Sequence, residues 1–189
     1  EKISQGFGTT WTIVEPGVSI KPYPCGVLTH PTIDSMLKLV SENNVKPDDI
    51  EAVKVYAGSN ILNPIRYPIA ANHLQAKFSL PAALAMIALA RRAGKTEFSD
   101  AFVSGAPMQA MQKRITTELD REIEKMGFDK MRSRIAIRLN DGNQIEGWAD
   151  ERYRGGPENP LSDADLEGKM RSCCEGVIDN HKQSRLIDA

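Results

Sequence analysis

The stretch RSRIAIRLNDGNQIEGWAD, residues 132–150, constrains the fold more than any other part of this chain. Its first half alternates apolar and polar side chains, and the apolar positions are Ile135, Ile137 and Leu139. Such alternation is typical of a strand with one buried face, and Asp141-Gly142 is a strong signal for a tight turn into a second strand. We therefore predict an antiparallel hairpin of residues 132–139 and 144–149, with its apolar face covered by helices.

Two segments have the pattern of helices that would cover such a sheet. The first follows Pro31 and ends near Asn44, and its apolar residues at helical spacing are Ile33, Met36, Leu37 and Val40. The second is FSLPAALAMIALARRAG, residues 78–94, which is rich in alanine and leucine. Gly94 is expected to end it. The apolar face of the hairpin is expected to pack against a layer that includes this second helix.

Weaker patterns fill in the rest of the chain. Ile50–Val55 and Ile115–Leu119 are predicted strands, residues 59–73 a long loop, and residues 11–14 and 18–21 short extended segments. A capping-box pattern at Ser162 and Asp165 predicts a final helix through Val177. The predicted fold class is α+β: a two-layer sandwich of a mainly antiparallel sheet of about four strands and covering helices, plus a C-terminal helix.

Composition argues against several classes of function. The formal net charge is −1 and Lys and Arg are spread along the chain, so no basic stripe favours nucleic acid or a membrane surface as partner. No apolar run approaches the roughly 20 residues of a membrane-spanning helix. The cysteines are odd in number and two are adjacent, which favours a reducing, cytoplasmic setting over a disulfide framework. No CxxC, HExxH or clustered His/Asp pattern predicts a metal site.

The stretch KPYPCGVLTHPTID, residues 21–34, carries the side chains best suited to chemistry. Lys21 can supply a positive charge or, where desolvated, a proton-transfer group, and His30 titrates closest to neutral pH. Two plainer interpretations stay open: Lys21 as a solvated strand end, and His30 as the cap of the helix that starts at Pro31. Cys25 is expected to be a small buried residue rather than a nucleophile.

A second candidate lies at the start of the alanine-rich helix. Lys77 and Ser79 would place a cation and a hydroxyl beside a helix N-terminus, where an anion binds well. The alternative is that Ser79 only caps the helix and that Lys77 is solvated. The residues alone do not decide between these two roles.

Five motifs in a fixed order resemble the MmgE/PrpD family. They are IKPYPCGVLTHPTIDSML, DDIEAVKVYAG, QAKFSLPAALAMIAL, the LNDG hairpin turn and NPLSDADLEGKM. That family includes 2-methylcitrate dehydratase, cis-aconitate decarboxylase and iminodisuccinate epimerase. The resemblance covers nearly the whole chain but only the carboxy-terminal portion of the family pattern, which implies that a large helical domain precedes it in a longer protein.

The resemblance also implies how the chain is divided and what it does. Residues 1–20 would lead into the domain, residues 21–152 would form an α+β lid domain, and residues 153–189 would be a linker and a helix that returns to the helical domain. The implied function is that of a cofactor-independent lyase or isomerase that removes a proton next to a carboxylate of a small di- or tricarboxylate. The implied assembly is a homo-oligomer such as a dimer. The alternative, from a different class, is a non-catalytic α+β module that binds a ligand or a partner chain.

The resemblance places Lys21 and the nearby histidine segment at the cleft between the two domains. The resemblance thus favours Lys21 as a catalytic residue and leaves His30 as a second candidate, with no metal or other cofactor implied. The candidate substrate-binding residues, chosen for their own side chains, are Tyr23, Lys77 and Ser79, and the alternative for Tyr23 is a packing role. Some decarboxylase-like members carry a second histidine five residues after the lysine, where this chain has Gly26. That departure favours a dehydratase or an epimerase over a decarboxylase.

Overall fold

The computed structural model describes residues 6–9 and 11–188, and in this part of the chain it contains one four-stranded sheet. The strands lie in the order β2-β1-β3-β4, and their bounds are Ile50–Ala57 (β1), Ile115–Leu119 (β2), Ser133–Leu139 (β3) and Gln144–Trp148 (β4). β1 and β2 are parallel, whereas the other two pairs, β1–β3 and β3–β4, are antiparallel. The predicted α+β class with a mainly antiparallel sheet is confirmed.

The predicted hairpin is present as β3 and β4. Gly142 in the turn has a φ of 88°, a conformation that glycine adopts without steric cost. Ile135 and Ile137 are fully buried, and Leu139 packs partly buried against the same core. The apolar face of the hairpin therefore faces the helical layer, as its alternation predicts.

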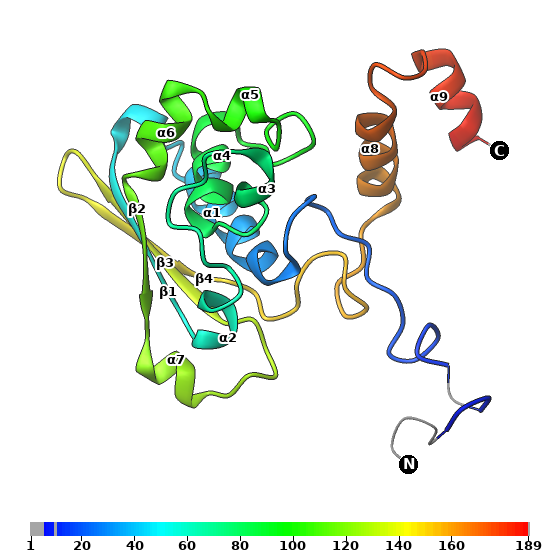
Figure 1. The fold of residues 1–189 in the computed structure, drawn as a ribbon, viewed down its shortest axis with the longest axis horizontal. Helices are drawn as coiled ribbons and strands as arrows, with labels where there is room; N and C mark the ends of the chain where they lie inside the picture. The colour runs from blue at the N-terminus through cyan, green and yellow to red at the C-terminus, as the bar shows by residue number, and fades with distance from the viewer. Residues whose placement is uncertain (1–5, 10, 189) are drawn as a thin grey trace.

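The helical layer is built mainly from α1 (His30–Glu42), α4 (Leu80–Ala90) and α6 (Ala106–Gln112), which lie against the sheet in Figure 1. The shorter elements are α2 (Ser59–Leu62), α3 (His73–Ala76), α5 (Asp100–Val103), α7 (Arg121–Lys125) and the 3-10 turns Val27–Thr29 and Pro47–Asp49. Each of the three main helices has a proline in its first turn, where the missing N–H leaves no intrahelical bond unmade. None of the described helices combines the length and the apolar composition needed to span a membrane.

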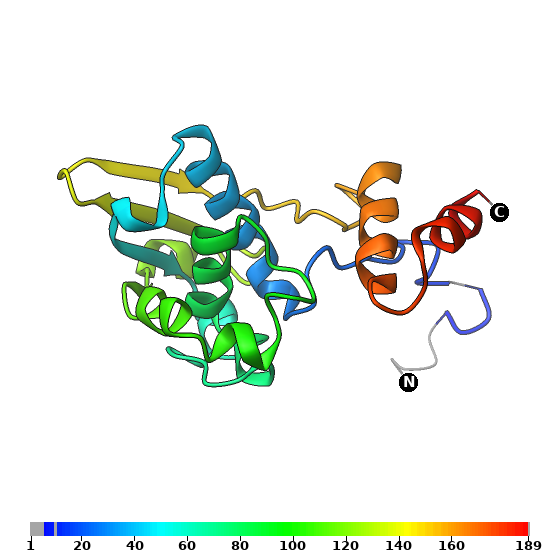
Figure 2. The same cartoon turned by 90° about the horizontal axis from the view of Figure 1, so that it is seen from above.

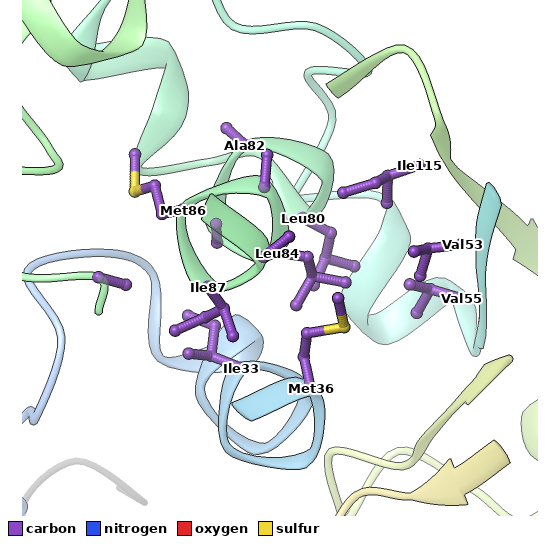
Figure 3. Packing of buried hydrophobic residues seen from close by; sticks show 14 of the residues in the cluster. Ile33, Met36, Val53, Val55, Leu80, Ala82, Leu84, Met86, Ile87 and Ile115 are labelled. Atoms are coloured by element: carbon purple, nitrogen blue, oxygen red, sulfur yellow. The ribbon is translucent and has the colours of Figure 1, made fainter. Parts of the chain in front are cut away.

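α4 is the centre of the core because it is apolar on all sides. Its residues from Leu80 to Ala88 are all buried. Figure 3 shows Ile87 beside Ile33 of α1, and Leu84 pointing towards Met36 and the strands. A helix without a polar face has to be enclosed by protein, and α4 is enclosed by α1, α6 and the sheet.

The end of α4 differs from the prediction. Arg91, rather than Gly94, is the C-cap: it has a φ of 55°, and its N–H bonds to the Ile87 carbonyl oxygen. Gly94 belongs to the following loop, where its N–H donates to the Glu97 carboxylate. A left-handed arginine is uncommon, so the sequence pattern favours the nearby glycine as the cap.

Both ends of the described chain lie beside the α+β body rather than within it, as Figures 1 and 2 show. The C-terminal part holds α8 (Asp163–Cys174) and α9 (Asn180–Ile187). α8 begins with the predicted Ser162–Asp165 capping box but ends before Val177. The sequence pattern does not predict α9, because its residues NHKQSRLI are mostly polar and form only two turns.

Two further predictions of local structure are wrong. Residues 11–16 form successive turns, in which the N–H groups of Val14 and Glu15 bond to the Trp11 carbonyl oxygen, so the extended segment predicted at residues 11–14 is absent. The loop predicted at residues 59–73 begins with α2 and ends at the first residue of α3. Helices of one turn are too short to leave a periodic pattern in the sequence.

Candidate functional site

The stretch from Lys21 to Asp34 forms a tight turn that leads into α1. The Lys21 Nζ atom donates a hydrogen bond to the Cys25 carbonyl oxygen at 3.1 Å. The Gly26 N–H donates to the Lys77 carbonyl oxygen at 2.9 Å, which fastens the turn to the segment before α4. Lys21 is exposed, so its ammonium group is held in place while it stays accessible to a ligand.

His30 is the first residue of α1, and its side chain is completely buried, with 0% of its surface exposed. Its ring packs edge-on against Tyr23, with the ring centres 5.4 Å apart and the ring planes at 84°. Neither ring nitrogen makes a hydrogen bond within the described residues, so the alternative that His30 caps α1 is wrong.

The imidazole of His30 is neutral at physiological pH. Its pKa is lowered to about 4, mainly by burial and in part by the charges of Lys21, Arg154 and Lys169. The Cys25 carbonyl lies close enough to oppose this shift, although its geometry is not that of a hydrogen bond. Protonation of a buried imidazole surrounded by positive charge costs free energy, which is the physical cause of the low pKa.

Tyr23 and Asp34 connect His30 to a distant part of the chain through Arg154. The Tyr23 hydroxyl donates to Asp34 Oδ1 at 2.6 Å and accepts from Arg154 Nη2 at 3.0 Å. Arg154 Nε donates to the same Asp34 oxygen at 3.2 Å. Burial raises the pKa of Asp34 and that of Tyr23, so the phenol stays protonated. Protein groups already engage the Tyr23 hydroxyl, which therefore is not free to bind a substrate in this arrangement.

Lys77 and Ser79, near the start of α4, have different surroundings. Ser79 is fully buried, and its hydroxyl oxygen accepts the Ala82 N–H at 3.0 Å, so it is the N-cap of α4. Lys77 is half-buried, and its positive charge acts on Cys25. Burial raises the pKa of the Cys25 thiol to about 11, and the charges of Lys21 and Lys77 both oppose that rise. Both lysines therefore bring positive charge to the same turn.

Replacing Ser79 with alanine is expected to destabilise the fold by about 1 kcal/mol, the usual cost of losing a helix cap. Denaturant unfolding at fixed pH measures the change. The matched control is Ser104→Ala, because Ser104 is exposed and its hydroxyl makes no hydrogen bond among the described residues; this variant is expected to keep the wild-type stability. A Ser79→Ala variant with unchanged stability and a raised KM would instead assign the hydroxyl to the substrate.

Gly26 leaves little room for a side chain. A Cβ atom at this position would lie 3.1 Å from Ile65 Cδ1 and 3.4 Å from the Lys77 carbonyl oxygen. The histidine that some decarboxylase-like proteins of the resembled family carry here would therefore require Ile65 to move. In this chain, Ile65 and the Lys77 carbonyl oxygen occupy the space beside Gly26 that a side chain would need.

The cysteines differ in their exposure and lie in two parts of the chain. Cys25 is buried, Cys173 is exposed and Cys174 is half-buried, and all are free. Cys25 Sγ lies 3.2 Å from Thr29 Oγ1, inside the turn. Among residues 6–9 and 11–188, no group of three or more His, Cys, Asp or Glu side chains could hold a metal ion.

The structure brings three of the predicted site residues to one turn: Lys21, His30 and Lys77 all lie near Cys25. Asp34 and Arg154 also belong to the site, although no sequence pattern assigned either of them to it. A signal for Asp34 exists, because it follows His30 by four residues and therefore shares its face of α1. No comparable signal exists for Arg154, whose partner Asp34 is 120 residues away in the sequence.

Comparison with known proteins gives one result beyond the structure. The sequence profile of the MmgE/PrpD C-terminal domain matches residues 23–189, which include His30, Lys77 and Arg154, whereas Lys21 lies just before the match. No curated protein matches the chain. The profile covers the sheet, the helical layer and both C-terminal helices. The chain therefore belongs to the MmgE/PrpD family and contains its C-terminal domain.

Proposed function

We propose that the chain is the lid of a lyase or isomerase that removes a proton next to a carboxylate of a small di- or tricarboxylate. Membership of a family of lyases and isomerases supports the reaction class. The lid would act together with a helical domain that supplies the opposite wall of the site, as the family resemblance implies. Such a reaction needs cations that bind carboxylates and a group that accepts the proton.

The observation that carries the proposal is the convergence of two lysines on one turn. Lys21 Nζ is held 3.1 Å from the Cys25 carbonyl oxygen, and the charge of Lys77 reaches the same residue. Two ammonium groups suit a ligand with two or more carboxylates. We assign to Lys21 either the proton transfer itself or the stabilisation of the negative charge that develops as the proton leaves.

For His30 we propose a supporting role, because its side chain is fully buried. The low pKa keeps the ring neutral, so the positive charge of the turn belongs to the two lysines. In this conformation a substrate does not reach the ring, and His30 can act as a base only if the turn opens. Tyr23 and Ser79 likewise support the site rather than touch the substrate, because their hydroxyls are engaged by Asp34 and by α4.

Dehydration or epimerisation is the preferred reaction, because the chain has Gly26 where some decarboxylase-like proteins have a histidine, and packing against Ile65 restricts a side chain there. We also propose a cytoplasmic homodimer. The free cysteines are compatible with a reducing compartment, and the dimer follows from the family resemblance alone.

The proposal is tested by exchange of substrate protons with solvent deuterium. The enzyme that unites this chain with the helical domain is incubated in deuterated buffer with a panel of small di- and tricarboxylates, and NMR follows the carbon next to each carboxylate. We expect exchange, elimination or epimerisation for at least one acid. We expect none with its monocarboxylate analogue, and none with this chain alone, because one wall of a cleft cannot exclude water or align the base.

A second candidate function, a non-catalytic binding module, is favoured by the complete burial of His30. The same experiment separates the two candidates. A folded two-domain protein that binds one of the acids, yet exchanges no proton of any acid in the panel, would reject the enzyme and support the binding module.

A further inference from the structure

Arg154 lies where three parts of the chain meet. Its Nη2 atom donates to the Tyr23 hydroxyl at 3.0 Å and its Nε atom to Asp34 Oδ1 at 3.2 Å. Its Nη1 atom donates to Asp165 Oδ1, in the first turn of α8, at 3.1 Å. All three nitrogens of the guanidinium group are therefore used, each with a different partner or element. A planar fork can do this, whereas the single ammonium group of lysine cannot hold the same geometry.

The residue that follows Arg154 fixes the segment before the candidate site. The Ile20 N–H donates to the Gly155 carbonyl oxygen at 2.8 Å, directly before Lys21. Gly155 has a φ of 86°, and a Cβ atom there would overlap the Ile20 carbonyl oxygen. The segment RYRGG, residues 152–156, thus contacts the chain directly before and shortly after Lys21. Gly155 bonds to Ile20, and Arg154 bonds to Tyr23.

Other contacts between α8 and the α+β body are weak. No residue of α8 is buried, and a hollow of about 380 Å³ is lined by Tyr23 and Arg154 together with Gly168 and Ser172 of α8. In the part of the chain that the structure describes, no hydrogen bond or ion pair other than those of Arg154 connects α8 to the body. The position of α8 is therefore set by this arginine more than by apolar packing.

We propose that Arg154 is a positioning residue that couples the placement of α8 to the turn carrying Lys21 and His30. A displacement of α8 would move Asp165 and, through their hydrogen bond, the guanidinium group of Arg154. The same guanidinium group bonds to the hydroxyl of Tyr23, and His30 packs against the Tyr23 ring. The charge of Lys169, on α8, already reaches His30 across this junction. The family resemblance assigns α8 to the segment that contacts the helical domain. If the proposed function holds, Arg154 would therefore make the geometry of the turn depend on how the two domains close.

The first test compares Arg154→Gln and Arg154→Lys with Arg152→Gln in the two-domain enzyme. Arg152 is a matched control, because its side chain is exposed and, among the residues that the structure describes, it pairs only with the neighbouring Asp150. We expect both Arg154 variants to lose about tenfold in kcat with KM nearly unchanged, the pattern of a misplaced catalytic group, and Arg152→Gln to match the wild type. Full activity of Arg154→Lys would overturn the proposal, because charge alone would then suffice.

The readout that does not depend on the proposed function is amide hydrogen exchange. In Arg154→Gln we expect faster exchange both in residues 20–30 and in α8, with β3 and β4 unchanged, whether or not a polycarboxylate is turned over. If exchange rises in α8 alone, Arg154 anchors the helix without positioning the turn, and the proposal is wrong. If the wild-type enzyme processes no acid but this exchange pattern is found, the proposed function fails while the coupling stands.

A double-mutant cycle tests the coupling directly. Tyr23→Phe and Asp165→Asn alter two groups that have Arg154 as their common partner. We expect the double variant to lose at least about threefold less activity than the product of the two single losses, a coupling of the size found between residues of one hydrogen-bond network. This non-additivity is expected to vanish in the Arg154→Gln background. Simple additivity in the presence of Arg154 would contradict the proposal.

Discussion

Replacing Lys21 with alanine is expected to lower kcat about a hundredfold or more in the enzyme that combines this chain with the helical domain of its family. Lys21 is the exposed cation of the turn, and the Cys25 carbonyl oxygen fixes its Nζ atom at 3.1 Å. The substitution removes either the group that transfers the proton or the charge that stabilises the anion, and the loss of either commonly has an effect of this size. Steady-state turnover of the acid identified by deuterium exchange provides the measurement.

Two further variants make this result interpretable. Lys21→Arg keeps the positive charge but does not release a proton, so partial activity would assign Lys21 to charge stabilisation, and a loss as large as that of Lys21→Ala would assign it to proton transfer. Lys125→Ala is the control, because Lys125 is exposed on α7 and its one partner within the described part of the chain is Glu122. Near-normal turnover by Lys21→Ala would place the chemistry in another part of the cleft.

The sequence predicts the parts of the fold that depend on contacts close in the chain. The β3–β4 hairpin is recognisable because alternation and turn residues lie within one short stretch, and α4 because its composition is uniform. The parallel pairing of β2 with β1 depends on how the connection between these strands, which contains α4 and α6, packs in the fold, so no local pattern reveals it. The one-turn helices α2 and α3 are missed for a similar reason, since neither is long enough to display a period.

The candidate site can likewise be predicted only where its residues lie close together in the sequence. Lys21 and His30 can be identified in the sequence because they lie within ten residues of each other in a stretch unusually rich in functional groups. What the sequence does not display is the burial of His30, which depends on Tyr23 covering the ring. It also does not display the contact of Asp34 with Arg154, because the fold alone brings these residues together. Side chains that support a site from a distant segment leave no local spacing to detect.

Acidification is expected to destabilise the protein through His30 by roughly 3 kcal/mol, on the scale of 1.36 kcal/mol for each pKa unit. The pKa of His30 is about 4 in the folded protein, because the ring is buried, against an ordinary value of 6.5 that the unfolded chain would show. Between these two values the unfolded chain binds a proton that the folded protein does not. This contribution to stability is therefore fully present above about pH 6.5 and is lost as the pH falls to about 4.

The measurement is the free energy of unfolding in denaturant at several pH values, for the wild type and for His30→Leu. Carboxylates with shifted pKa values are present in both proteins, among them Asp34, whose pKa burial raises, and Asp165, whose pKa is lowered by its bond to Ser162. Their contributions largely cancel in the difference between the two profiles. The charged groups that act on the ring are Lys21, Arg154 and Lys169, and all three are present in both proteins. We therefore expect the difference profile to slope between pH 6.5 and 4, with the wild type losing stability faster as the pH falls. Parallel profiles would mean that His30 becomes exposed to water in solution. His30 would then be accessible to a substrate.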